Sequence, residues 1–195
     1  IFKLSGFIPG TSTAIRNILS FSVTSKHSTL PSAERAATTV ERAAVTCLHM
    51  DVYLLLDRSD RAVAVCLAYL RQVGIDWTAH PDDQQVRFEY QQIWTQLGER
   101  SIEQLIDLPL MEDAASLMTV NALGKLFPPA LQTNANLACL SICKAISLCL
   151  EGGNCDAASM HYANAFRVFG RRFGDYQAGF RFGQLGCALV EQRGL

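Results

Sequence analysis

Cysteines are the residues of this sequence with the widest chemical potential, because thiolates bind zinc and undergo redox reactions. The seven cysteines are Cys47, Cys66, Cys139, Cys143, Cys149, Cys155 and Cys187. A zinc site favours compact paired spacing in polar surroundings, whereas these cysteines alternate with leucine, isoleucine and alanine. We therefore expect no metal site. We expect reduced, buried thiols on apolar helix faces, with Cys139, Cys143 and Cys187 as examples, as in a cytosolic protein.

Other catalytic and cofactor-binding patterns are absent from the sequence. His49 lies between Leu48 and Met50, whereas the phosphoacceptor of a histidine kinase is followed by an acid and needs an ATP-binding module. There is no Gly-x-x-x-x-Gly-Lys-Ser/Thr loop for nucleotide phosphates, and local context suggests no Ser-His-Asp or Cys-His arrangement. The sequence predicts no catalytic residue and no cofactor.

Two sets of residues are candidates for contact with a partner. Arg171 and Arg172 could bind a phosphate or a partner's carboxylate; the simpler alternative is that one of them pairs with Asp175 and fixes the turn. Trp77 and Trp94 could line a groove for a peptide; the simpler alternative is that the loop of the first packs onto the helix of the second.

The most distinctive element is the helix expected after Asp175, which can cap it. Gly179, Gly183 and Gly186 recur at steps of four and three residues, so they share one face of this helix. Each glycine costs roughly 1 kcal/mol relative to alanine inside a helix. Close approach of a neighbouring helix is the expected compensation, so these three glycines are predicted helix-packing residues.

The rest of the chain from residue 32 on has the spacing of apolar residues that is typical of helices. We expect helices over 33–56, 60–73, 82–97, 101–108, 113–127, 135–151, 155–169 and 176–192. The predicted inner face of the first is Ala37, Val40, Ala44, Cys47, Leu48 and Val52. Predicted caps are Asp60, Asp82 or Asp83, Asp113, Thr133 or Asn134, and Asn154, with Ser101 and Gln104 as a capping box and Pro128–Pro129 as a break.

No stretch alternates with period two for long enough to predict a strand. The predicted fold is all-α, with consecutive antiparallel helix pairs stacked as a short α-solenoid. Residues 1–31, rich in serine and threonine and without an acid, form an expected irregular leader that loosely mimics a targeting peptide, and residues 32–195 a helical repeat-like domain.

Composition narrows the classes of partner. The net charge of −1 gives no electrostatic case for nucleic acid or a membrane surface, and no segment has the 18 or more uninterrupted apolar residues of a membrane span. Apolar residues make up 49% and charged residues only 18% of the chain, whereas about a quarter is usual for charged residues. We therefore expect some apolar surface to be covered by neighbouring domains, and both ends of the chain look cut.

The last predicted helix pair, residues 158–192, resembles a tetratricopeptide-type repeat, with its glycines at the small-residue positions of the second helix. A wider resemblance covers residues 34–195. The chain is similar to the helical middle region of large bacterial signalling proteins through the strings at 57–63, 100–111, 148–154, 173–186 and 189–195. It departs from that family at Ala114, where proline is usual, and at Gly152, where histidine is usual.

This resemblance implies a role rather than a reaction. The family carries a serine/threonine-kinase-like module, a P-loop ATPase-like module, this helical region, a GAF sensor and a histidine kinase. The resemblance therefore implies a cytoplasmic, non-catalytic relay segment whose partners are neighbouring domains of the same polypeptide. Two alternatives remain: a stand-alone helical peptide-binding adaptor, and a helical small-molecule sensor with a pocket near Trp77 and Trp94.

Overall fold

A computed structural model of the chain describes residues 32–194, with side chains from Thr39 onward. This part contains seven α-helices and one 3-10 helix: α2 (Ser32–Leu55), α3 (Ser59–Gln72), α4 (Asp83–Leu97), η1 (Glu103–Asp107), α5 (Ala114–Thr133), α6 (Ala135–Gly152), α7 (Asp156–Phe173) and α8 (Tyr176–Arg193). Its only β-type pairing is an isolated bridge between Leu110 and Asn154. The prediction of an all-α fold is confirmed, and the predicted leader lies outside the described residues.

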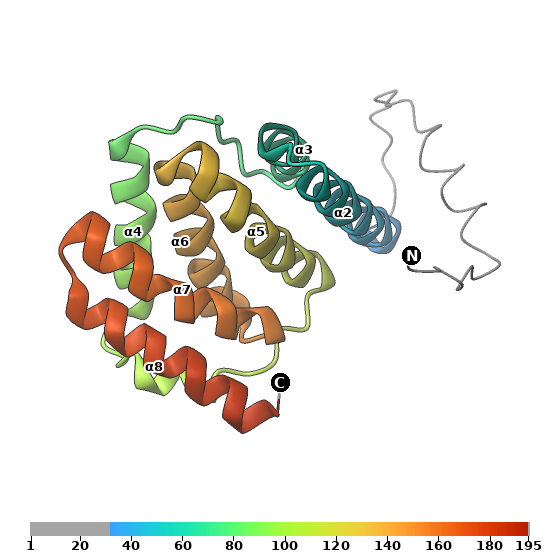
Figure 1. Cartoon of the computed structure of the whole chain (residues 1–195). Helices are drawn as coiled ribbons and strands as arrows, with labels where there is room; N and C mark the ends of the chain where they lie inside the picture. Colours follow the sequence, from blue (N-terminus) through green and yellow to red (C-terminus); the bar gives the residue numbers. More distant parts are fainter. Residues whose placement is uncertain (1–31, 195) are drawn as a thin grey trace, which may run out of the picture.

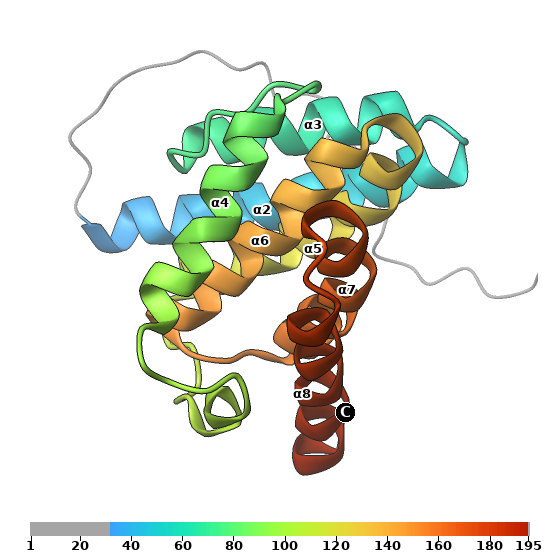
Figure 2. The ribbon, with the colours of Figure 1, turned by 90° about the vertical axis from the view of Figure 1, so that its left-hand side faces the viewer.

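Consecutive helices pack as pairs, with α3 against α2, α6 against α5 and α8 against α7. Helix α4 is the exception, because it packs against α6. The α2–α3 pair lies on one side of the molecule and α8 on the other (Figure 1). In the turned view, α7 and α8 run steeply across the direction of α2 and α3 (Figure 2). The two end pairs therefore join through the central helices α5 and α6.

Helix α6 is the core helix. It contacts α4, α5 and α7, and Leu137, Leu140, Ile142 and Ile146 are fully buried. An all-round apolar helix needs neighbours on several faces, and α6 has them. By length and composition it is the one helix of residues 32–194 that could cross a membrane, but 67% of it is buried within the protein.

Four predicted caps are confirmed, because each side chain accepts a hydrogen bond from a backbone N–H of the first turn. The acceptors are Asp82, Asp113, Asn134 and Asp175, with donor–acceptor distances of 2.8, 2.7, 3.1 and 3.0 Å. The capping box is also formed, since the Ser101 N–H donates to Gln104 Oε1 (2.7 Å) and the Gln104 N–H donates to Ser101 Oγ (3.4 Å). It opens the 3-10 helix η1.

The predicted break at Pro128–Pro129 is wrong, since α5 continues through both prolines to Thr133. Each proline lacks an N–H, and an interior proline costs roughly 3 kcal/mol relative to alanine. The turn survives because Pro129 and Ala130 are buried against neighbouring helices. The Ala130 carbonyl also accepts from the Asn134 N–H at 2.8 Å. Tertiary packing outweighs local propensity here.

Two other predicted caps are wrong. Helix α3 begins at Ser59, so Asp60 lies inside its first turn, where its carboxylate pairs with Arg58 at 3.4 Å. Asn154 does not cap α7, which begins after Cys155 and runs beyond Phe169 to Phe173. The Asn154 side chain instead points inward and satisfies buried polar groups, which a cap on the surface would leave unpaired.

Candidate functional site

The described part of the chain holds no metal centre, since it has no group of three or more His, Cys, Asp or Glu side chains that could bind an ion. Six cysteines are buried reduced thiols. The expectation for Cys187 is wrong, because it is exposed. It shares a face of α8 with Phe180, Gln184 and Glu191, all of them exposed.

The glycine stripe of α8 lies directly against α7. A Cβ atom at Gly186 would lie 2.6 Å from the Ser159 carbonyl oxygen and 2.7 Å from the Ala163 nitrogen, both of them backbone atoms. At Gly179 the nearest atom would be Cα of Phe166, at 3.2 Å, and at Gly183 it would be Cβ of the same residue, at 3.6 Å. The two helices thus approach most closely at Gly186, where only hydrogen fits.

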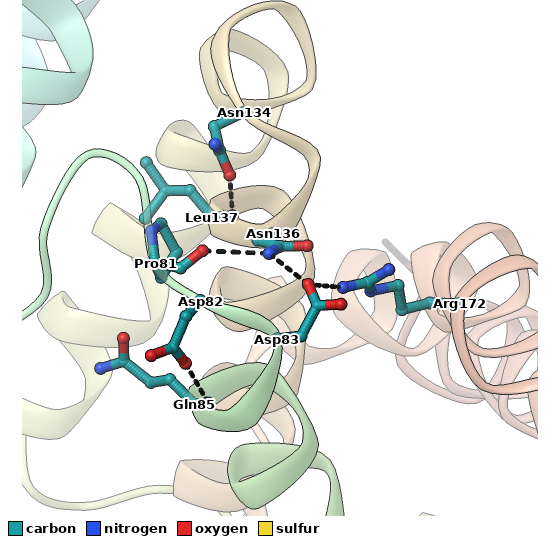
Figure 3. Close-up of polar contacts among 8 residues, drawn as sticks. All are labelled: Pro81, Asp82, Asp83, Gln85, Asn134, Asn136, Leu137 and Arg172. Carbon is teal, nitrogen blue, oxygen red and sulfur yellow. Dashed lines mark hydrogen bonds and ion pairs between the residues drawn. The ribbon is translucent and has the colours of Figure 1, made fainter.

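Arg172 connects the end of α7 to the start of α4. Its guanidinium pairs with Asp83, so the predicted pairing with Asp175 is wrong (Figure 3). Asp83 also accepts a hydrogen bond from the Asn136 amide at 2.9 Å. The pKa of Asp83 is lowered mainly by this hydrogen bond, and next by the Arg172 guanidinium. Arg171 is exposed and free to contact solvent or another molecule.

Asp175 does not pair with an arginine but contacts Tyr90 of α4. Besides capping α8, it accepts a hydrogen bond from the Tyr90 hydroxyl at 2.7 Å. Burial, followed by this bond to a carboxylate, raises the pKa of Tyr90. The Tyr90 ring also stacks on Phe173, with the ring centres 3.8 Å apart. The turn between α7 and α8 is therefore fixed to α4 by an aromatic and a polar contact.

The two tryptophans form no open groove. Trp77 is only 4% exposed, so it has almost no surface to offer a peptide. Trp94 is partly buried, and its ring meets Tyr90 and Phe182 edge-on, with centres 5.7 and 6.3 Å apart. Both side chains contribute to the core.

An open cleft of about 530 Å³ lies between α2, α5 and α7. Its polar feature is an ion pair, in which Lys125 Nζ lies 2.5 and 2.8 Å from the two carboxylate oxygens of Asp51. The remaining lining is Cys47, Leu54, Met118, Asn121, Gly124, Pro128, Ala157 and Met160. The cleft is largely apolar, and its two charges neutralise each other, so it offers a ligand little beyond shape and the Asn121 amide.

The outer face of α2 is an exposed apolar surface that the sequence analysis missed. Val45, Leu48, Val52 and Leu55 follow one another at steps of three, four and three residues, and they are 36, 54, 52 and 87% exposed. We call these four residues the α2 outer face. Ala44, Leu48 and Val52 were predicted to face inward, which is wrong, because all three are exposed and Ala43, Cys47 and Met50 are the buried residues. Ala37, predicted to lie on the same face, precedes the described side chains. The sequence did contain a signal for this exposed surface. Helix α2 carries two apolar stripes, and helices that pack on one side of it can cover only one of them.

No family model matches the chain, and neither a curated protein nor a solved structure matches it.

Proposed function

We propose that this chain is a non-catalytic helical scaffold and relay segment of a multi-domain signalling kinase. It would join an ATPase-like and kinase-like half to a GAF and histidine-kinase half. The observation that carries the proposal is the α2 outer face, a row of large apolar side chains left open to solvent. Contiguous exposed apolar patches of this kind mark interaction sites in many proteins.

The occupant we assign to the α2 outer face is the module that precedes this segment in the parent polypeptide. Helix α2 is the first described helix, and the resemblance places the ATPase-like module on that side. The low charged fraction of 18% supports a surface made for contact within a larger protein. In this proposal the helices form a short solenoid-like array, in which a shift at α2 reaches α8 through α5 and α6 because each helix contacts its neighbours.

The experiment uses the complete polypeptide and compares hydrogen exchange of α2 there and in the isolated chain. We expect slower exchange over residues 45–55 in the complete polypeptide, and a weaker response of the histidine-kinase output to input signal in Leu48→Lys. Phe88→Lys is the matched control, because Phe88 is 57% exposed but lies on α4. Equal exchange in the two proteins, together with an unchanged response, would contradict the proposal.

A second candidate function, a helical small-molecule sensor, is favoured only by the cleft between α2, α5 and α7. A thermal-shift screen against nucleotides and metabolites tests it. Saturable binding that Asn121→Ala removes would favour the sensor over the relay. Reproducible capture of one peptide partner by the isolated chain, lost in Leu48→Lys, would favour the peptide-binding adaptor instead.

A further inference from the structure

Helix α8 presents a second stripe to solvent, beside the glycine stripe that α7 covers. Its members recur at steps of four, three, four and three residues, and we call them the α8 seam: Tyr176, Phe180, Gly183, Cys187 and Val190. Tyr176, Phe180 and Val190 are 66, 56 and 37% exposed, and Cys187 is exposed as well. The main neighbours of α8 are α7 and η1, and neither of them covers this stripe.

The spacing of the α8 seam is that of a coiled coil. Steps of four and three residues average 3.5, a repeat that keeps a row of apolar side chains facing one partner helix along its whole length. The seam keeps this repeat over residues 176–190. The pattern therefore fits another α-helix that packs lengthwise along α8.

The two halves of the seam differ in size. Gly183 lies seven residues from each end, with the aromatic rings of Tyr176 and Phe180 before it and the smaller Cys187 and Val190 after it. Because Gly183 has no side chain, a second backbone can approach closely at the middle of the seam. A helix that runs antiparallel to α8 and has the same order of sizes would set large side chains against small ones.

Helix α7 widens the apolar surface beside the middle of the seam. Phe166 is 55% exposed. A Cβ atom at Gly183 would lie 3.6 Å from the Phe166 Cβ, so the ring of Phe166 borders the seam. The surface available to a partner is thus broader than one helix.

The exposed charges around the seam have opposite signs at its two ends. Arg167 and Arg171 lie in the second half of α7, beside the start of α8, and Glu191 lies in the last turn of α8. All three are exposed, and within residues 39–194 none of them forms an ion pair. The other charges near the two ends already have partners in the chain: Asp156, Arg172, Asp175 and Arg193. The seam therefore has a basic end and an acidic end.

We propose that the α8 seam is the interface of a homodimer, in which the α8 helices of two copies of this chain pack antiparallel about a two-fold axis near Gly183. A two-fold interface uses the same surface on both copies. The antiparallel direction sets the aromatic half of each seam against the small half of the other. It also brings Glu191 of each copy toward the basic end of the other, whereas parallel helices would set like charges together.

This dimer is independent of the relay function. The α8 seam and the α2 outer face belong to the two end pairs, on different sides of the molecule (Figure 1). A second copy on α8 therefore leaves the α2 outer face open to the preceding module. The two proposals can fail separately.

Single cysteines test whether the seams meet. Cys187→Ala removes the exposed thiol, and the other six cysteines are buried. In this background of the complete chain, Gly183→Cys adds a thiol where a Cβ atom has room, and Thr95→Cys adds one at an exposed position of α4 as the control. We expect a short bismaleimide to link two Gly183→Cys chains at least about tenfold faster than two Thr95→Cys chains, because association raises the effective concentration of the thiols.

A mixture of Tyr176→Cys and Val190→Cys chains, in the same background, tests the direction of packing. These positions are about 21 Å apart along α8, so a short crosslinker cannot join them in a parallel pair. We expect the main product to contain one chain of each variant. Products that join two identical chains would overturn the antiparallel arrangement.

Sedimentation equilibrium of the unmodified chain measures the dimer without crosslinking. Phe180→Lys should raise the dissociation constant at least about tenfold, and circular dichroism should show an unchanged fold, because Phe180 is more than half exposed. Phe88→Lys, on α4, is the control and should leave the constant unchanged. A chain that stays monomeric, with equal crosslinking of Gly183→Cys and Thr95→Cys, would overturn the proposal. Slower hydrogen exchange of 176–190 in a monomeric complete polypeptide would also overturn it, and would assign the seam to a neighbouring domain.

Discussion

Helices α2 and α8 lie in the two end pairs, and each carries a conspicuous stripe. In α8 the stripe is bare backbone, and α7 covers it so closely that a Cβ atom at Gly186 would meet backbone atoms at 2.6 and 2.7 Å. In α2 the outer stripe is made of large apolar side chains, and Leu55 is 87% exposed. The glycine stripe of α8 is covered by α7, whereas the α2 outer face is exposed in the part of the chain that the structure describes. The stripe of small residues thus marks a contact within the chain, and our proposal assigns the second stripe, of large residues, to a contact with another module.

The largest expected effect is at Asn154, which ties the start of the closed α7–α8 pair to the rest of the protein. Its amide donates to the Leu105 carbonyl at 2.7 Å, and its oxygen accepts from the Tyr162 hydroxyl at 2.8 Å. Asn154→Ala leaves two buried groups unpaired, so we expect a loss of about 4 kcal/mol of unfolding free energy. Urea denaturation measures it.

Asn164→Ala is the control for this substitution. Its amide donates to the Met160 carbonyl of the same helix at the surface, so its loss should cost under about 0.5 kcal/mol. Similar losses of unfolding free energy in the two variants would show that the hydrogen bonds of Asn154 contribute no more to stability than the surface hydrogen bond of Asn164.

The second prediction compares two glycines of one stripe. Gly186→Ala should cost about 3 kcal/mol, because the new methyl group would press on the backbone of α7. Gly183→Ala should stabilise by up to about 1 kcal/mol, because its methyl group would make an ordinary contact at 3.6 Å and alanine favours the helix. Thermal unfolding of both variants measures the two effects. Destabilisation of equal size would mean that the distance between α7 and α8 does not determine the cost of adding a methyl group.

The third prediction concerns pH and the contact of α7 with α5. His161 is fully buried, with Nε2 3.0 Å from the Val120 carbonyl oxygen, and burial lowers its pKa from 6.5 to about 4. Between these values the unfolded chain binds the proton and the folded chain does not, so stability falls as pH falls below 6.5. We expect a loss of roughly 2 kcal/mol at pH 5 relative to pH 7.5.

His161→Gln tests the assignment, because the glutamine amide can take the place of Nε2 and donate to the Val120 carbonyl but does not titrate. The denaturation midpoint of this variant should change much less between pH 7.5 and pH 5. An unchanged pH slope would assign the acid sensitivity to another group.

Local rules predicted the local features of this fold, and contacts between distant residues set the rest. Asp82, Asp113 and Asp175 were recognisable as caps because a cap acts on a backbone amide three residues away. The partner of Arg172 is Asp83, 89 residues away, and no spacing rule reaches that far. Asn154 was assigned to the nearest helix start because its acceptor and donor partners, Leu105 and Tyr162, come together only in the folded protein.

The candidate surface on α2 was hidden for a related reason. Helical periodicity identifies apolar stripes but does not say which of two stripes the chain itself will cover. Leu48 and Val52 fit the inner face as well as Cys47 does, and only the position of α5 and α3 decides between them. The glycine stripe was easier to interpret from the sequence. Glycines on one face of a helix are costly, and the close approach of a neighbouring helix is almost the only feature that explains them.

The smallest effect on stability is expected for substitutions in the α2 outer face, and this prediction tests the contrast between α2 and α8 most directly. Leu48→Lys combined with Val52→Lys should change the unfolding free energy of the isolated chain by less than about 0.5 kcal/mol, because both side chains are more than half exposed. Met50→Ala is the matched buried change on the same helix and should cost about 2–5 kcal/mol. A loss above about 2 kcal/mol in the double lysine variant would mean that the chain covers this face itself. The contrast between the exposed α2 outer face and the covered glycine stripe of α8 would then be lost, and with it the reason for assigning α2 an external partner.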